Sequence, residues 1–380
     1  LICNIDLVTD NSLTTAERAQ YKAEAKIFRA MVMFDMVRLW GDFPVITTVA
    51  DDITSENIDE VYPQYFPKQN TELEAYQQIE RDLLDAVQYA PDNTPGNKTL
   101  FSKSVARTLL AKIYAEKPLR DYTKVIQYCD EVKADGFDLV DDFSDLFGMN
   151  AAGTDAKMRN TKESILEAQF TSGAGNWCTW MFGRDLVNWN NNFTWAKWVT
   201  PSRDLISAFK QEGDEVRFKE SIVYYDCNWS NYYPSDNYPF MYKCRSANSS
   251  IIKYRYADVL LLKAEALIMQ DTPDLEGAAD IIDKVRDRAK LGALPTSVRS
   301  NKNVLLNALL KERRLELAFE GQRWFDLVRL DKVEEVMNAV YSKDSGRKAQ
   351  IYTFDKNSYR LPIPQSVIDA NDKIHQNPGY

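Results

Sequence analysis

Two stretches of this chain repeat the same apolar spacing. One begins at Leu109 (LLAKIYAEKPLRDYTKVIQYCDEVKADG) and the other at Leu261 (LLKAEALIMQDTPDLEGAADIIDKVRDRAKLG). When Asp121 is aligned with Asp274, small or medium apolar residues follow 4, 8 and 11 positions later in both stretches. A helix with such a face can lie close against the helix before it. The pattern therefore predicts tetratricopeptide-like helical hairpins.

Two further pairs of segments have the helical period, residues 16–40 with 72–89 and residues 303–320 with 322–340. The sequence thus predicts four hairpins, which are not contiguous. Thr14 and Glu17 fit a capping box at the start of the first helix. Residues 42–70 read as a polar insertion, and its acidic part lacks the spacing of an EF-hand.

Residues 137–250 interrupt the helical pattern. They contain many Asn and Gly residues, little helical period, and short β-leaning runs at 163–170 and 221–226. We therefore predict a mainly α fold in which helical hairpins form a superhelical frame with a loop-rich, partly β subdomain. The predicted parts are residues 1–136 and 251–380 for the frame, with 137–250 inserted between them.

Composition removes several classes of function. The net charge is −9 and the pI about 5.0, so electrostatic binding to nucleic acid is not expected. His375 is the single histidine, which argues against His-based catalytic and zinc sites. The five cysteines are scattered without a C-x-x-C motif, and no apolar run is long enough to span a bilayer. We predict no cofactor and no metal.

Residues 311–330 (KERRLELAFEGQRWFDLVRL) are the most densely charged candidate for a site. On a helix, Glu312, Glu316 and Glu320 share one stripe, and four acid–base pairs fall at i, i+3. They are Arg313–Glu316, Glu320–Arg323, Arg323–Asp326 and Asp326–Arg329. We interpret the charges as structural and not as a catalytic cluster, with a break between two helices at Gly321.

The same segment carries a resemblance. ERRLELAFEGQRWFDLVRL is similar to a diagnostic stretch of the SusD/RagB family, as are residues 23–47, 137–150, 254–267 and the C-terminal LPIPQSVIDANDKIHQNPGY. The signature positions are Glu312, Arg313, Arg314, Glu316, Glu320, Gly321, Arg323, Trp324, Asp326 and Arg329.

The resemblance implies a SusD-like fold and a non-catalytic role in polysaccharide utilisation. Family members are cell-surface lipoproteins of the Gram-negative outer membrane that capture glycans and pass them to a SusC-like TonB-dependent transporter. Members carry an export signal, a lipidated cysteine and a further helical segment before the region where this chain starts. Attachment to the membrane through a lipid anchor is thus implied by the family.

The sequence itself nominates ligand-binding residues. Five of the eight tryptophans lie within 176–198, among asparagines. Indole faces match the apolar C–H faces of sugars, and carboxamides can both donate to and accept from hydroxyls. The candidates are Trp177, Trp180, Trp189, Asn190, Asn191, Trp195 and Trp198. The alternative is that these tryptophans fix the irregular segment to the helices.

A second aromatic patch lies within 224–242 and includes Trp229, Tyr232 and Tyr233, although its alternation fits a core-covering hairpin equally well. Trp40, at the end of the first helix, is a further candidate. Two rival functions stay open: a glycoside hydrolase using a carboxylate pair, and a helical-repeat scaffold that binds peptide in a concave groove.

Overall fold

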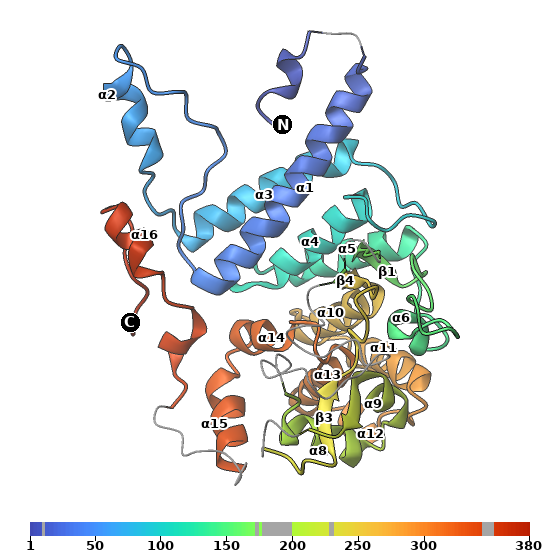
Figure 1. The fold of residues 1–380 in the computed structure, drawn as a ribbon. Coiled ribbons are helices and arrows are strands. Elements are labelled where there is room, and N and C mark those ends of the chain that lie inside the picture. The colour runs from blue at the N-terminus through green and yellow to red at the C-terminus, as the bar shows by residue number, and fades with distance from the viewer. Residues whose placement is uncertain (10–11, 172–174, 177–199, 228–231, 344–352) are drawn as a thin grey trace.

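The computed structural model describes residues 1–9, 12–171, 175–176, 200–227, 232–343 and 353–380. Within these ranges, helices in antiparallel pairs make up most of the molecule (Figure 1). The frame helices are α1 (Thr15–Trp40), α3 (Glu72–Tyr89), α4 (Lys103–Ala115), α5 (Tyr122–Ala134), α10 (Tyr256–Met269), α11 (Leu275–Arg288), α13 (Lys302–Glu316), α14 (Arg323–Arg329) and α15 (Val333–Lys343).

The first hairpin follows directly from local signals. Thr14 accepts from the Glu17 amide and the Glu17 carboxylate accepts from the Thr14 amide, so the predicted capping box is confirmed. The helix ends at Gly41, whose φ of 73° favours glycine. Small residues on the inner faces, such as Ala30 of α1 and Ala75 of α3, are fully buried and let the two helices approach closely.

The two repeat-like hairpins also form as predicted. Asp121 and Asp274 are the N-caps of α5 and α11, and their carboxylates accept from backbone amides three residues on. The aligned apolar positions are all buried: Val125, Cys129, Val132, Ala278, Ile282 and Val285. These residues belong to one continuous core that runs through the hairpins α1/α3, α4/α5 and α10/α11.

The fourth hairpin differs from the prediction in its second helix. The expected helix over 322–340 is divided into α14 and α15 by a turn in which Asp331 adopts a φ of 54°. The predicted break at Gly321 is confirmed, since α13 ends at Glu316 and Gly321 has a φ of 75°.

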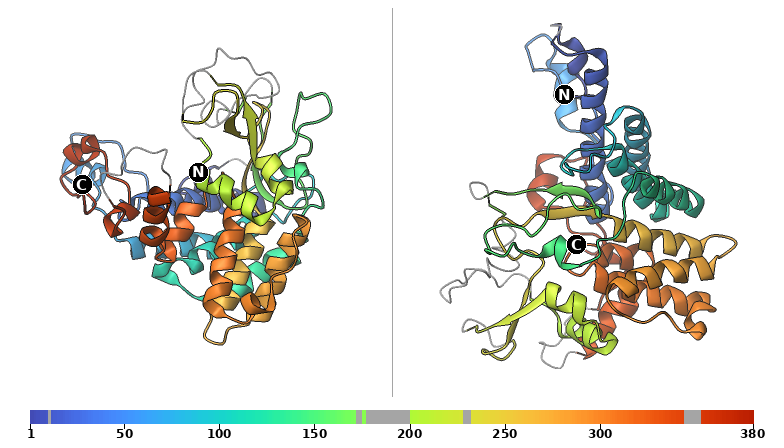
Figure 2. Two further views of the ribbon diagram at one scale, coloured as in Figure 1. Left: turned by 90° about the horizontal axis from the view of Figure 1, so that it is seen from below. Right: turned by 90° about the vertical axis from the view of Figure 1, so that its right-hand side faces the viewer.

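The inserted segment forms short elements beside the frame. The β-leaning runs are confirmed as β1 (Ser164–Ala168) and β2 (Ile222–Tyr225). Strand β1 pairs antiparallel with β4 (Ile251–Arg255), and β2 forms a hairpin with β3 (Tyr238–Met241). The segment also has more helix than its weak period suggested: α6 (Ser144–Phe147), α8 (Arg203–Glu212) and α9 (Glu215–Ser221). In Figure 2, left, the β2–β3 hairpin rises from one side of the helices.

The remaining short elements are α2 (Ile58–Val61), α12 (Thr296–Arg299) and α16 (Gln365–Ala370), with 3₁₀ turns at Ile5–Leu7, Tyr62–Tyr65, Lys117–Leu119 and Lys356–Tyr359. The C-terminal tail wraps back onto the first hairpin. The Leu361 amide donates to the Leu39 carbonyl at 2.7 Å, and Asn377 Nδ2 donates to the Trp40 carbonyl at 2.9 Å.

The charged stripe of α13 faces inward. Glu316 is completely buried, and it accepts from Arg255 Nη1 at 2.5 Å, from Arg217 Nη1 at 3.0 Å and from Arg288. Arg255 also binds Glu163 at 2.7 Å and Glu320 at 2.7 Å. We call these residues the glutamate clamp. It joins α13 to α9, α11, β4 and the start of β1.

A second buried cluster joins α13 to three other frame helices. Arg313 donates to Asp258 of α10 at 2.8 Å and to Asp326 of α14 at 2.8 Å. Asp258 also accepts from Lys112 of α4 at 2.6 Å, and Arg329 of α14 binds both Asp326 and Glu265. Buried charges are tolerated only when they are paired in this way.

The structural interpretation of residues 311–330 is therefore supported, but the predicted pairing was wrong in detail. Of the four i, i+3 pairs, the structure shows Asp326–Arg329 as an ion pair. The principal partners of Glu316, Glu320 and Arg313 come from other elements, while Arg323 donates to the Leu310 carbonyl. The reason is burial: in a dry interior each carboxylate needs several donors, which one helix cannot supply.

Removing one arginine from the clamp should be costly. In the Arg255→Met variant, Glu163, Glu316 and Glu320 lose a shared buried donor, and we expect the free energy of unfolding to fall by about 3–5 kcal/mol. Arg299→Met is the matched control, since Arg299 also holds three carboxylates, Glu276, Asp280 and Asp283, but at the surface. It should lose about 1 kcal/mol or less. Equal losses in urea unfolding would contradict the role of burial.

Lys243 gives the clamp a measurable pH dependence. Its buried ammonium donates to the Glu316 carbonyl at 2.9 Å and to Glu320 at 2.6 Å, and burial lowers its pKa to about 8, against 10.5 for an ordinary lysine. Between these values the unfolded chain binds the proton and the folded chain does not. Stability from this group therefore rises as pH increases from 8 to 10.

The Lys243→Met variant lacks this titration while keeping the side-chain volume. We expect the wild-type protein to gain stability relative to the variant between pH 7.5 and pH 10, measured by urea unfolding at each pH. A constant difference across that range would show that Lys243 titrates normally.

Candidate functional site

Two cavities flank α8 in the inserted segment. The helix begins at Ser202, whose hydroxyl accepts from the Leu205 amide at 3.1 Å, and ends at Gly213 in the left-handed conformation. Its inner face buries Leu205, Ile206 and Phe209 against Leu315 and Ala318, which belong to α13 and to the turn after it. Its outer face is left to line the cavities.

Arg217 holds the α8–α9 unit on the frame. Its side chain is completely buried and binds Asp214 at 2.5 Å, Glu312 at 2.6 Å and Glu316 at 3.0 Å. Guanidinium–carboxylate contacts of this kind fix orientation as well as distance. The glutamate clamp therefore sets the position of α8 relative to α13, and with it the walls of both cavities.

The first cavity, which we call the tyrosine pocket, has a volume of about 460 Å³. It lies between α8 and the β2–β3 hairpin. Its lining residues are Arg203, Ile206, Ser207, Lys210 and Gln211 of α8, Tyr224 of β2, and Tyr233, Pro234 and Asn237 of the connection to β3. It combines aromatic rings, amides, a hydroxyl and cationic groups in one concave surface.

Aromatic and cationic groups stack at one wall of this pocket. The Arg203 guanidinium carbon lies 3.9 Å from the ring centre of Tyr232 and 4.8 Å from that of Tyr233. The rings of Tyr232 and Tyr233 meet edge to face at 4.9 Å, and Tyr233 meets Tyr238 in the same way at 5.5 Å. The Tyr233 hydroxyl donates to the Pro201 carbonyl at 2.8 Å. This wall is thus held in one geometry.

Tyr224 lies on another part of the pocket lining. Its ring packs against the α8 core cluster and lies 6.4 Å from that of Phe218, and burial raises the pKa of its hydroxyl. In the described part of the chain that hydroxyl has no hydrogen-bond partner, so it is available to a ligand as a neutral donor or acceptor.

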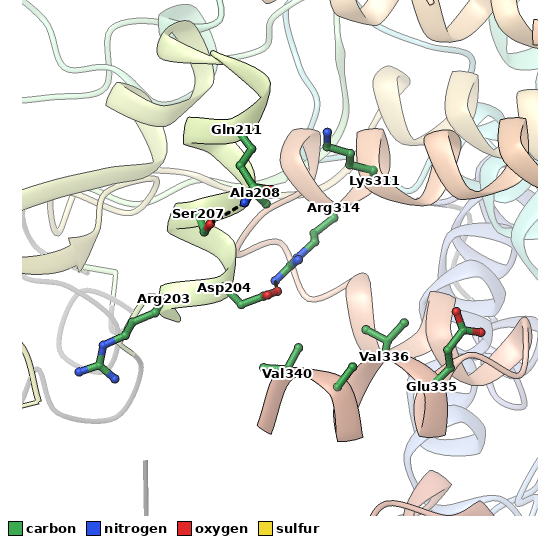
Figure 3. Close-up of a pocket in the computed structure, with 11 residues that line it drawn as sticks. Arg203, Asp204, Ser207, Ala208, Gln211, Lys311, Arg314, Glu335, Val336 and Val340 are labelled. Carbon is green, nitrogen blue, oxygen red and sulfur yellow. Dashed lines mark hydrogen bonds and ion pairs between the residues drawn. The ribbon is translucent and has the colours of Figure 1, made fainter. Parts of the chain in front are cut away.

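The second cavity lies on the other side of α8, between α8, α13 and α15 (Figure 3). We call it the α8–α15 cleft, and its volume is about 790 Å³. Arg314 reaches across it to Asp204 at 2.6 Å, and Val336, Ala339 and Val340 of α15 form an apolar wall. Arg203, Ser207 and Gln211 line both cavities.

The structure places only part of the predicted binding set. Tyr233 lines the tyrosine pocket and Tyr232 stacks beside it. Trp40 ends α1 and lies beside the C-terminal tail, away from the residues that line either cavity. The other candidates lie outside the described residues: Trp177, Trp180, Trp189, Asn190, Asn191, Trp195, Trp198 and Trp229. Their role stays a prediction.

Several residues of the pocket were not found from the sequence. Arg203, Lys210 and Gln211 lie in the segment that the sequence predicts to be rich in loops, and Tyr224 is the first residue of the predicted aromatic patch but is not among its candidates. The hairpin alternative for that patch is what the described strands show, with Tyr238 buried beneath Tyr233. The available signal was the spacing of Leu205, Ile206 and Phe209, which marks α8 as an amphipathic helix.

The rival functions find less support in this geometry. Hydrolysis of a glycoside needs two opposed carboxyl groups. Among the described residues no carboxylate lines the tyrosine pocket, and the two in the α8–α15 cleft are paired, Asp204 with Arg314 and Glu335 with Lys332. A peptide-binding scaffold needs a concave groove on the repeat hairpins, where a cavity between α5, α10 and α11 has only about 180 Å³.

Two family models match the chain. The model described as "SusD family" matches residues 236–380, and the one described as "Starch-binding associating with outer membrane" matches residues 3–115. No helix among the described residues is long and apolar enough to cross a membrane.

Individual relatives match along the whole chain. SusD-like protein P2 of Formosa agariphila is 28% identical over 100% of this chain and 77% of that protein. Starch-binding protein SusD of Bacteroides thetaiotaomicron is 24% identical over 99% of this chain and 76% of its own length. A solved structure of a laminarin binding SusD-like protein has a TM-score of 0.73 and 24% identity, covering 100% of this chain and 82% of that one. The predicted fold class is confirmed by this likeness.

Proposed function

We propose that the chain binds oligo- or polysaccharide at the face formed by α8 and the β2–β3 hairpin, without catalysis, because two SusD family models and a full-length SusD-like relative match it. Relatives of this chain are named for binding starch and laminarin and not for a reaction, which agrees with the prediction that it is not an enzyme.

The observation that carries the proposal is the tyrosine pocket. Tyr224 and Tyr233 each pack on the α8 core and line the cavity, so each ring is held rigidly at the pocket surface. Such rings can contact the C–H face of a sugar at little entropic cost. Gln211, Asn237 and Ser207 supply the paired donors and acceptors that sugar hydroxyls require.

Replacing the pocket tyrosines should weaken glycan binding without unfolding the protein. We expect Tyr233→Ala, which removes a ring, and Tyr224→Phe, which removes only a hydroxyl, each to lower affinity about two- to tenfold. Affinity gel electrophoresis against a panel of soluble polysaccharides measures this. Tyr89→Ala is the control, since Tyr89 is 51% exposed at the end of α3 and lines neither cavity.

The same panel tests whether the tryptophan-rich segment contributes to glycan binding. A variant with alanine at 177, 180, 189, 195 and 198 is expected to lose affinity as well, because we propose that these indoles extend the binding face. If this variant and both tyrosine variants bind every glycan that the wild-type protein binds, with unchanged affinity, the proposed binding face is wrong.

We further propose that the protein acts at the outer membrane, as a lipid-anchored surface protein that passes glycan to a SusC-like TonB-dependent transporter. The support is the family and the description of the matched model as associating with the outer membrane. The helical frame, on the side away from the β2–β3 hairpin, is the proposed docking face.

Docking and glycan binding should then be separable. The Tyr233→Ala variant is expected to co-purify with the transporter of its uptake system as efficiently as wild type, even where its glycan affinity has fallen. Loss of co-purification in this variant, with the fold intact by circular dichroism, would place the docking face at the pocket instead.

A further inference from the structure

The charged side chains that line the tyrosine pocket have one sign. Two ionisable side chains other than tyrosine line it, Arg203 and Lys210, and both are cationic. Among the described residues, no carboxylate joins them in the lining. This is unusual for a chain with a net charge of −9, in which acidic side chains outnumber basic ones.

The nearby carboxylates are directed elsewhere. Glu212 binds Arg286 at 2.6 Å and also Lys311, and Asp204 binds Arg314 on the cleft side of α8. Asp236 lies in the turn between Pro234 and Asn237 and is exposed, but it does not line the pocket. These carboxylates therefore do not offset the charge of the Lys210 ammonium in the pocket lining.

Lys210 is the cation best suited to meet a ligand. It is exposed near the end of α8, and no carboxylate pairs with it within the described residues. In the cleft, by contrast, Lys311 is paired with Glu212 and Arg314 with Asp204. The carboxylates of α8, Asp204 and Glu212, are thus neutralised by residues of other helices, whereas the ammonium of Lys210 is not neutralised by a carboxylate of the described residues.

We propose that the tyrosine pocket selects acidic glycans, in which Lys210 binds a carboxylate or sulfate on a sugar whose ring packs on Tyr224 or Tyr233. The inference rests on the proposed glycan-binding function and adds the substrate class. A neutral glycan can accept a hydrogen bond from this ammonium, whereas an anionic group also gains the attraction of the opposite charge.

Matched pairs of polymers test this selectivity. The pairs are polygalacturonate with its fully methyl-esterified form, and dextran sulfate with dextran, run in affinity gels at low salt and again at 0.5 M NaCl (about a 4 Å Debye length). We expect one acidic polymer to retard the wild-type protein more than its neutral counterpart, with the difference reduced at high salt. Which pair shows the effect distinguishes carboxylate from sulfate.

Lys210→Gln locates the effect. It should weaken binding of the acidic polymer about three- to tenfold, while Lys219→Gln, which removes an exposed lysine of α9 outside both cavities, should leave it unchanged. The proposal is overturned if the two members of each pair bind equally, or if Lys210→Gln binds as wild type does.

The outcomes also separate this inference from the proposed function. If neutral polysaccharides alone are bound, and Tyr233→Ala weakens that binding, the acidic selectivity is wrong and glycan binding at the pocket stands. If neither these polymers nor a wider panel is bound by the folded wild-type protein, both fail together.

Discussion

The contact of Glu316 with three arginines is the interaction on which the arrangement of this protein depends. One completely buried carboxylate meets Arg217, Arg255 and Arg288, which come from α9, the end of β4 and α11. Burial alone would raise the pKa of Glu316, but the guanidinium groups hold it well below its ordinary range, so the carboxylate stays charged. Because the buried carboxylate of Glu316 stays charged, it requires its arginine partners to remain in place.

This requirement explains why charges and not only apolar contacts join the inserted segment to the frame. Apolar packing is non-directional, and helices can slide over one another at modest cost. An arginine that donates from different nitrogens to carboxylates of different elements fixes both their angle and their register. Arg217 fixes the α8–α9 unit on the frame in this way. The walls of the tyrosine pocket are therefore held in position although they are built from short elements.

Helix α13 serves the core and the surface at once because of its period. Glu312, Arg313 and Glu316 point inward, while Lys311 and Arg314 lie on the opposite face and line the α8–α15 cleft. The densely charged stretch is thus neither a catalytic cluster nor an ordinary solvated face. Its inward charges hold the frame together, and its outward charges pair across the cleft with residues of α8.

Local sequence signals were sufficient to predict the hairpins α1/α3, α4/α5 and α10/α11. The spacing of apolar residues, the capping boxes at Thr14 and Thr71 and the N-caps at Asp121 and Asp274 are local signals, and a helix responds to residues within a few positions. The ordered motifs along the chain also indicated its similarity to the SusD family, which two family models and a full-length relative match.

Which charges meet, and where a ligand can bind, depends on packing between segments that are distant in the sequence. Arg217 and Glu312 are 95 positions apart, and the walls of the tyrosine pocket come from α8 and from a hairpin that follows it by way of α9. Acidic, basic and aromatic residues are common along the chain, so their spacing in the sequence does not identify which of them interact. Burial selected the partners, because each desolvated carboxylate could persist only where several donors converged on it.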